Sequence, residues 1–468
     1  MIPRLNHPFT LGTVRWRRIT MAALLLAPGL GVLPAEWFSA AVSARAQGEP
    51  QPSSPASAAA ARPRTELRGV WLTANDMPVL RDRERMQQMV AQLARLNFNT
   101  LYPVVWNGGI TYYPSEVMQG RGLQDFTFRG LQGQDVIGEL IAEGRRQGLL
   151  VIPWFEFGFM APPGSELARR HSAWLTSKQD GTLTSISAAG EVKWLNPFRP
   201  EVQQLITDLV LEVVGKYGAD GIQFDDHTTL PREFGYDSFT VALYRRETGR
   251  NPPANPADPA WVKWRADKIT AFMDRLSKAV RARRPGAIVS ISPNYYDFAY
   301  KLQLQDWRAW VRQGIADELL VQIYRPDLES FTPHMWRPEV QEARQRIPTA
   351  MAILSGQRNR PTPAQLMQQK VLASRQAGLG VAFFYLESLW NLGPEPAEHR
   401  QATLAGLFSA PAARLGAGGS AALLPATPAT DQLLPPASST LPQLGLPVAP
   451  PPTTAPLKPW PESLPPIP

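Results

Sequence analysis

The sequence contains no cysteine, few histidines and no long apolar run. Without cysteine the chain has no disulfide, no thiolate nucleophile and no cysteine ligand for zinc or an iron–sulfur cluster. Its five histidines form no H-x-x-x-H or H-x-x-E-H pattern, and neither a G-x-S-x-G elbow nor a glycine-rich phosphate loop is present. The candidate functional groups are therefore carboxylates, hydroxyls, amides and rings. We expect no metal and no other cofactor.

Basic residues exceed acidic ones by 48 to 40, but this excess does not indicate a nucleic-acid partner. Half of the resulting +8 charge lies in residues 1–46, which we expect to be removed. The remainder is spread over the chain without a stripe of lysine or arginine. We therefore expect no nucleic acid among the partners, and oligomeric state is left open.

Residues 1–46 are predicted to be a cleavable signal peptide. A basic region at residues 15–18 precedes an apolar stretch at 19–33, and Ala44-Arg45-Ala46 offers a small-residue cleavage site. A membrane anchor is the alternative, but a spanning helix needs about 20 continuous apolar residues and a Pro-Gly pair interrupts this stretch. We therefore expect a periplasmic or secreted protein that has no membrane contact after cleavage.

Composition divides the rest of the chain into three parts. Residues 47–64 are rich in alanine, serine, proline and glutamine and are predicted to be a linker. Residues 410–468 are rich in proline and alanine and carry few charges, so we predict a disordered tail. Residues 65–409 remain as one catalytic-type domain.

This domain alternates short β-type runs with helix-period stretches eight times, which predicts an α/β fold of the (β/α)8 TIM-barrel type. A doubly wound open sheet is the alternative. The predicted strands are Leu67–Thr73, Asn99–Trp106, Leu149–Phe157, Ala219–Asp226, Ile288–Asn294, Leu319–Tyr324, Thr349–Ser355 and Val381–Leu386. The predicted helices are Asp82–Leu96, Gln134–Gln147, Pro200–Tyr217, Pro259–Arg284, Gln305–Gln313, Pro338–Ile347, Pro363–Ala377 and Pro396–Phe408.

Extra residues fall between strand and helix in three consecutive units, at 107–133, 158–199 and 227–258. These stretches after strands 2, 3 and 4 are βα loops, which lie at the C-terminal face where barrels build their active sites. Their many aromatic residues fit a carbohydrate cleft, although about half of such rings are expected only to pack the loops onto the barrel.

The fourth predicted strand ends in two adjacent acids, Asp225 and Asp226, followed by His227. An ionised carboxylate at the end of an apolar strand is costly unless it has a partner or a function. Strand alternation sends the two acids in different directions, so we expect one to point into the barrel mouth and the other to brace a neighbour. A salt-bridged pair at the barrel rim, or a cation site with His227, is the alternative use of the same atoms.

Glycoside hydrolysis needs two carboxyl groups, one protonated and one ionised, about 5–5.5 Å apart for retention or 6.5–9.5 Å for inversion. Neighbouring strands stand about 4.8 Å apart, so Glu156 on strand 3 and Asp225 on strand 4 suit either geometry. Burial among aromatic rings should raise the pKa of Glu156, as a general acid requires. Asp327 and Glu387, which follow strands 6 and 8, are the substitutes for either role.

At these residues the chain resembles the family-10-like glycoside hydrolases of bacterial envelopes, over about residues 64–390. The motifs that carry the resemblance are Arg68-Gly69-Val70-Trp71-Leu72-Thr73, Asn99-Thr100-Leu101-Tyr102, Trp194-Leu195-Asn196-Pro197, Asp220-Gly221-Ile222-Gln223-Phe224-Asp225-Asp226, Ile291-Ser292-Pro293 and Gln322-Ile323-Tyr324. The fourth motif also resembles the nucleophile segment of the α-amylase and α-galactosidase clans, which implies Asp225 as nucleophile. Many members of the envelope family carry asparagine where this chain has Glu156.

The resemblance implies a glycosidase that cuts peptidoglycan glycan strands already stripped of their stem peptides. Asp225 is then the nucleophile or base, Glu156 the acid and Asp226 a further catalytic candidate. Candidates for contacts with the sugar are Arg68, Trp106, Trp154, Asn196, His227, Asn294, Gln322, Tyr324, Asp327 and Glu387. The alternatives are a barrel that binds wall glycan without cutting it, and a glycosidase acting on storage polysaccharide or exopolysaccharide.

Overall fold

The computed structural model describes residues 65–123, 134–187, 190–415 and 422–423. The predicted signal peptide, the linker and most of the predicted tail lie outside the described residues. Within the described part, no helix is long and apolar enough to cross a membrane.

The described chain forms a closed parallel barrel of eight strands, which confirms the predicted TIM barrel. Closure is made by β1, which pairs in parallel with β2 on one side and with β13 on the other. The third strand is split, since β4 and β5 both pair with β2. The strands are β1 (Arg68–Leu72), β2 (Thr100–Asn107), β4 (Leu150–Val151) with β5 (Trp154–Phe155), β9 (Gly221–Asp225), β10 (Ile288–Ser292), β11 (Glu318–Gln322), β12 (Thr349–Leu354) and β13 (Gly380–Phe384).

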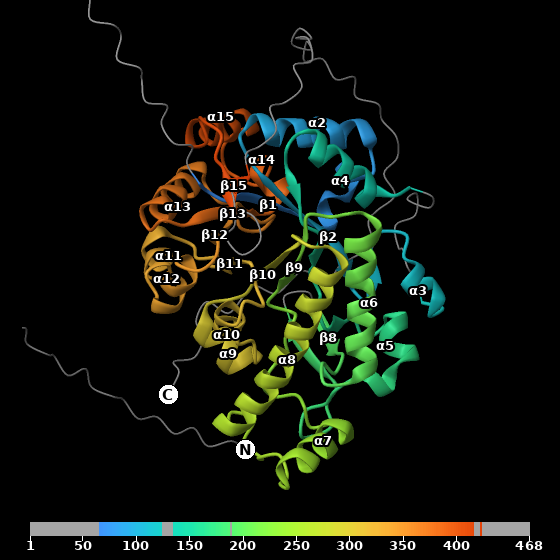
Figure 1. The fold of residues 1–468 in the computed structure, drawn as a ribbon. Helices are drawn as coiled ribbons and strands as arrows, with labels where there is room; N and C mark the ends of the chain where they lie inside the picture. The colour runs from blue at the N-terminus through green and yellow to red at the C-terminus, as the bar shows by residue number, and fades with distance from the viewer. Residues whose placement is uncertain (1–64, 124–133, 188–189, 416–421, 424–468) are drawn as a thin grey trace, which may run out of the picture. The chain divides into compact units, whose positions relative to one another are not determined.

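A helix follows each barrel strand in the chain. Figure 1 shows these helices around the barrel. Their starts have physical causes in the sequence: Asp82, Asp135 and Asp258 cap three of them, and proline occupies the first turn of three. The helices are α2 (Arg83–Arg95), α4 (Val136–Arg146), α6 (Pro200–Lys216), α8 (Pro259–Arg283), α10 (Trp307–Arg312), α12 (Pro338–Arg344), α13 (Ala364–Gln376) and α15 (Ala397–Leu407).

The βα loops contain structure that the periodicity did not predict. The loop that follows the third barrel strand forms a small antiparallel sheet of β6 (Met160–Ala161), β8 (Gly190–Trp194) and β7 (Thr184–Ser187). The other additional elements are η1 (Ala74–Asp76), α1 (Met77–Leu80), β3 (Ile110–Thr111), α3 (Glu116–Gly120), α5 (Glu166–Arg170), η2 (Ser172–Trp174), α7 (Ser238–Thr248), α9 (Tyr296–Gln303), α11 (Leu328–Met335) and α14 (Leu386–Trp390). Most aromatic residues in the described parts of the three long loops are buried.

Polar side chains form a hydrogen-bonded chain inside the barrel. Trp71 donates to Gln223 at 2.6 Å, and Gln223 donates to Ser290 at 2.9 Å. Ser290 donates to Glu318 at 2.8 Å, and the buried Glu318 pairs with Arg414. Arg414 begins β14 (Arg414–Leu415), which pairs with β15 (Ala422–Leu423), so the first residues assigned to the predicted tail pack against the barrel.

Candidate active site

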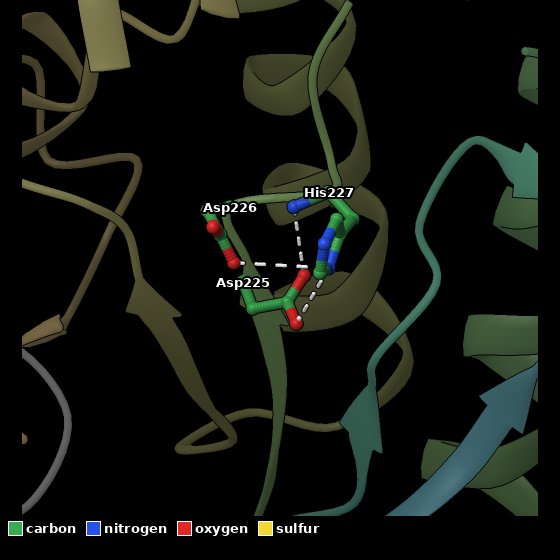
Figure 2. Close-up of side chains that lie close together, drawn as sticks. All are labelled: Asp225, Asp226 and His227. Carbon is green, nitrogen blue, oxygen red and sulfur yellow. Dashed lines mark hydrogen bonds and ion pairs between the residues drawn. The ribbon is translucent and has the colours of Figure 1, made fainter. Parts of the chain in front are cut away.

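Asp225 is the last residue of β9 and is 1% exposed. Trp154 on the neighbouring strand β5 donates its indole N–H to the Asp225 Oδ2 atom at 3.2 Å, and the backbone N–H of His227 donates to Oδ1 at 2.9 Å. Figure 2 shows how the turn after β9 brings His227 back over this carboxylate. Burial raises the pKa of Asp225 to about 6, although the charge of His227 opposes the shift.

Asp226 follows in the turn and is held by the two strands on its other side. Asn294 donates to Oδ2 at 2.7 Å, and Gln322 donates to Oδ1 at 3.2 Å. Asn294 and Gln322 also form a parallel bridge that extends the pairing of β10 with β11. Asp226 is braced by its neighbours, as expected, but the two acids do not diverge, since both line one pocket. Strand alternation does not apply to Asp226, because β9 ends at Asp225.

Glu156 follows β5 directly and lines the same pocket as the two aspartates. Asn107 at the end of β2 donates to its Oε2 atom at 2.5 Å. Burial and then the negative charge of Asp225 raise the pKa of Glu156 to about 7, while the hydrogen bond from Asn107 opposes the rise. Near neutral pH this carboxyl group is therefore partly protonated.

His227 contacts both aspartate carboxylates and the backbone of Glu156. Its Nδ1 atom lies 2.9 Å from the backbone carbonyl of Glu156, 3.2 Å from Asp225 Oδ2 and 3.7 Å from Asp226 Oδ1. Burial would lower the pKa of His227, but the charges of Asp225 and Asp226 outweigh it and raise the pKa to about 10. The side chain is therefore an imidazolium at neutral pH.

Ligand-type atoms of Asp225, Asp226 and His227 lie within 4.8 Å of one another, a spacing that suits a metal ion. The Nδ1 atom of His227 lies 2.9 Å from the backbone carbonyl oxygen of Glu156, which can only accept a hydrogen bond, so this nitrogen carries a proton and offers no lone pair to a metal. A metal would also compete with the donors Trp154 and Asn294 for the same carboxylate oxygens. The arrangement therefore fits a carboxylate cluster held by hydrogen bonds within the protein better than a metal centre.

Aromatic rings form the walls of the pocket around these acids. Trp71 and Trp154 contact each other edge to face, as do Trp71 and Phe384, and Tyr324 stacks on Phe384 with centroids 5.4 Å apart. The pocket is lined by Trp71, Trp154, Glu156, Asp225, Asp226, His227, Gln322, Tyr324 and Phe384. Flat aromatic faces beside carboxylates suit the apolar faces of a sugar ring.

Of the residues predicted from the sequence, the structure brings Glu156, Asp225, Asp226, Trp154, His227, Gln322 and Tyr324 into the pocket, with Asn294 behind Asp226. Trp71 and Phe384 were missed, although each lies near the end of its barrel strand. An aromatic side chain near the end of a barrel strand was the feature of the sequence that could have identified them as pocket residues. Asn107, the partner of Glu156, is polar and not aromatic, but its position at the end of β2 was likewise visible in the sequence.

Three predicted sugar contacts lie elsewhere and need correction. Arg68 begins β1, so it lies at the opposite end of a parallel barrel, where it pairs with Glu66. Trp106 is fully buried and donates to the backbone carbonyl of Gly158 at 3.0 Å. Asn196 is also fully buried and donates to Asp237 at 3.0 Å. This hydrogen bond connects the loop after the third barrel strand to the loop after the fourth.

The two substitute acids are also outside the pocket. Asp327 is exposed and caps α11, accepting the backbone N–H of Ser330 at 2.7 Å. Glu387 lies in α14, where it pairs with Arg358 and accepts the hydroxyl of Tyr385 at 3.2 Å. In both places the chain has already turned from the strand into a helix, which carries the side chain away from the barrel axis.

A family model described as "Glycosyl hydrolase-like 10" matches residues 66–374. "Glycosyl hydrolase DigH" of Escherichia coli strain K12 is 27% identical over 328 residues, which cover 60% of this chain and 72% of that protein. The protein of the same name from Shigella flexneri matches equally.

Solved structures with the same fold include two glycoside hydrolases. The PgaB (BpsB) glycoside hydrolase domain of Bordetella bronchiseptica is similar with a TM-score of 0.55 and 15% identity, over 73% of this chain and 99% of that one. α-L-Fucosidase isoenzyme 2 of Paenibacillus thiaminolyticus is similar with a TM-score of 0.51 and 14% identity, over 74% of this chain and 49% of that one. At these identities the likeness establishes the fold.

Proposed function

The chain belongs to the glycosyl hydrolase-like 10 family, and we propose that it is an exported glycosidase that cleaves peptide-stripped glycan strands of peptidoglycan. The observation that carries the proposal is that carboxyl groups from adjacent barrel strands, Glu156 and Asp225, meet in one pocket with aromatic walls. Family membership supports the glycosidase activity. The choice of substrate rests on the sequence resemblance and on the predicted signal peptide.

The electrostatics of the pocket support a division of roles between the acids. Glu156 has the higher pKa, about 7, and is the general acid that protonates the leaving oxygen of the glycosidic bond. Asp225 has the lower pKa, about 6, and is ionised when Glu156 is still protonated, so it acts as nucleophile or base. Both values are raised by burial in the pocket.

Two further side chains position these groups. The His227 imidazolium contacts Asp225 through Nδ1 at 3.2 Å and stabilises its ionised form, which keeps the pKa of Asp225 below that of Glu156. Asp226 receives hydrogen bonds from Asn294 and Gln322, lines the pocket and is available to accept sugar hydroxyl groups.

A substrate panel tests the proposal. Mature protein is incubated separately with peptide-stripped glycan strands, intact sacculi, a storage polysaccharide and a neutral exopolysaccharide, and the products are analysed by mass spectrometry. Shortening of the stripped strands alone is the expected result. Shortening of another polysaccharide but not of the strands would change the substrate, and binding of the strands without any new reducing end would make the barrel a glycan-binding module.

A further inference from the structure

The hydrogen-bond donors that line the pocket are largely engaged within the protein. The engaged pairs are Trp71 with Gln223, Trp154 with Asp225, Gln322 with Asp226 and with the carbonyl of Ser292, and the Nδ1 atom of His227 with Asp225 and with the carbonyl of Glu156. Tyr324 differs from them, because its hydroxyl group forms no hydrogen bond with any residue that the structure describes. This donor is left for a ligand.

The side chain of Tyr324 is nevertheless fixed in place. Its ring stacks on Phe384 with centroids 5.4 Å apart and an angle of 27° between the planes. Arg360 donates to the backbone carbonyl of Tyr324 at 3.3 Å. The buried Lys370 donates to the carbonyl of the next residue, Arg325, at 2.5 Å. A hydrogen bond from a side chain that is already ordered costs little further conformational entropy, so the hydroxyl is prepared for a ligand.

The Tyr324 hydroxyl lies close to the carboxylates of the pocket. Burial, and then the negative charges of Asp226, Asp225 and Glu156, raise the pKa of Tyr324 well above its usual value. The hydroxyl therefore stays protonated at neutral pH and acts as a donor. Because no hydrogen bond joins it to these acids, a group of the substrate can lie between the hydroxyl and the carboxylates and contact both.

The position of the scissile bond determines which group this hydroxyl meets. In the proposed reaction Asp225 acts at the anomeric carbon, C1, and the C2 substituent is attached to the neighbouring carbon of the sugar ring. A donor close to Asp225 and Asp226 is therefore close to the C2 substituent when C1 faces Asp225. Hydrogen bonds to the C2 substituent strengthen as the transition state forms, so they contribute to kcat.

We propose that the Tyr324 hydroxyl donates a hydrogen bond to the C2 substituent of the cleaved sugar and that Asp226 accepts one from the same substituent. Asp226 has room for it, because a carboxylate has about four acceptor sites and only Asn294 and Gln322 donate to this one in the described chain. In peptidoglycan the C2 substituent is an acetamido group, whose carbonyl oxygen suits Tyr324 and whose N–H suits Asp226. The identity of the substituent rests on the proposed function.

The test removes the donor from the protein and the acceptor from the substrate. Nitrophenyl glycosides with an acetamido group, a hydroxyl group or hydrogen at C2 are given to wild type, Tyr324→Phe and the control Tyr385→Phe, whose lost hydroxyl donates to Glu387 outside the pocket. We expect Tyr324→Phe to lose about tenfold to a hundredfold in kcat/KM on the acetamido glycoside, mainly through kcat, and to match wild type on the 2-deoxy glycoside. The control should match wild type on all three.

Tyr324→Phe keeps the ring that stacks on Phe384, so its melting temperature should equal that of wild type. Unchanged kcat/KM on the acetamido glycoside would overturn the inference and leave Tyr324 as a wall of the pocket. Equal losses on the acetamido and 2-deoxy glycosides would also overturn it, since the hydroxyl would then act elsewhere. A loss confined to the 2-hydroxy glycoside would contradict the pairing with an acetamido group.

Failure of the proposed function gives a different result. If wild type cleaves none of the glycosides, calorimetry is used to measure binding of an N-acetylglucosamine oligomer and of a glucose oligomer with the same linkage. Weaker binding of the first sugar alone by Tyr324→Phe supports the hydrogen bond without turnover. Equal binding of the first sugar by wild type and Tyr324→Phe would overturn it.

Discussion

Replacement of Glu156 by glutamine tests the division of roles between the two pocket acids. The pKa of Glu156 is about 7 and that of Asp225 is about 6, and in the active form Glu156 is protonated and Asp225 is ionised. The dependence of kcat/KM on pH should therefore be bell-shaped, with its maximum between pH 6 and 7. At pH 8 about one-tenth of Glu156 remains protonated, which predicts a fall of about tenfold per pH unit above the maximum. The two limbs belong to the coupled pair of acids.

Glu156→Gln cannot donate this proton, so kcat/KM on natural glycan should fall by about 10² to 10⁴-fold and the alkaline limb should disappear. A glycoside with a nitrophenol leaving group needs little protonation and should lose far less. The assay is the release of reducing ends or nitrophenol from pH 4 to 9. An alkaline limb that survives in the variant, or equal losses on both substrates, would refute the role of Glu156 as acid.

Asn107→Ala is the matched control for this experiment. Its hydrogen bond to Glu156 lowers the pKa of the carboxyl group, so its removal should raise that pKa and move the alkaline limb to higher pH. The acidic limb, which belongs mainly to Asp225, should stay in place. A shift of the alkaline limb toward lower pH would show that another group titrates there.

Three further predictions concern the structure around the pocket. Gly158→Ala should lower both activity and melting temperature, because the new Cβ would lie 2.2 Å from the His227 carbonyl oxygen at a residue with φ of +48°; an unchanged melting curve would contradict the close packing. His227→Gln removes the cation that stabilises ionised Asp225, so the acidic limb of the pH profile should move to higher pH, and a fixed limb would argue against the ion pair. Arg414→Gln leaves Glu318 buried without its partner and should cost about 3–5 kcal/mol of unfolding free energy by urea denaturation. Adding Glu318→Gln should restore part of that loss, whereas additive losses would contradict the pairing.

Strand and helix positions were predictable because apolar periodicity and strand–helix alternation determine them directly. The eight strands and the eight surrounding helices lie where the sequence predicts them, within a few residues at each end. The loop elements were not predictable in this way. The small sheet formed by β6, β7 and β8 depends on pairings as distant as that of Met160 with Trp194, which local periodicity does not record.

The site was predictable where a side chain lies at the end of a strand and not where the chain has already turned. Asp225 and Glu156 follow the strand-end pattern and reach the pocket. Asp327 follows the same pattern in the sequence, but the start of a helix takes its carboxylate as a cap. Arg68 shows a separate error, since a residue that begins a parallel strand lies at the face opposite the active site.

Glycosidic cleavage in this pocket is proposed to depend on the Asp225 carboxylate. The most direct measurement is the release of new reducing ends from peptide-stripped glycan strands by wild type and by Asp225→Asn, beside the binding of both proteins to the same strands. We expect wild type to shorten the strands, and the variant to bind them with similar affinity and leave them intact. Strand shortening by Asp225→Asn at the wild-type rate would contradict a catalytic role for Asp225.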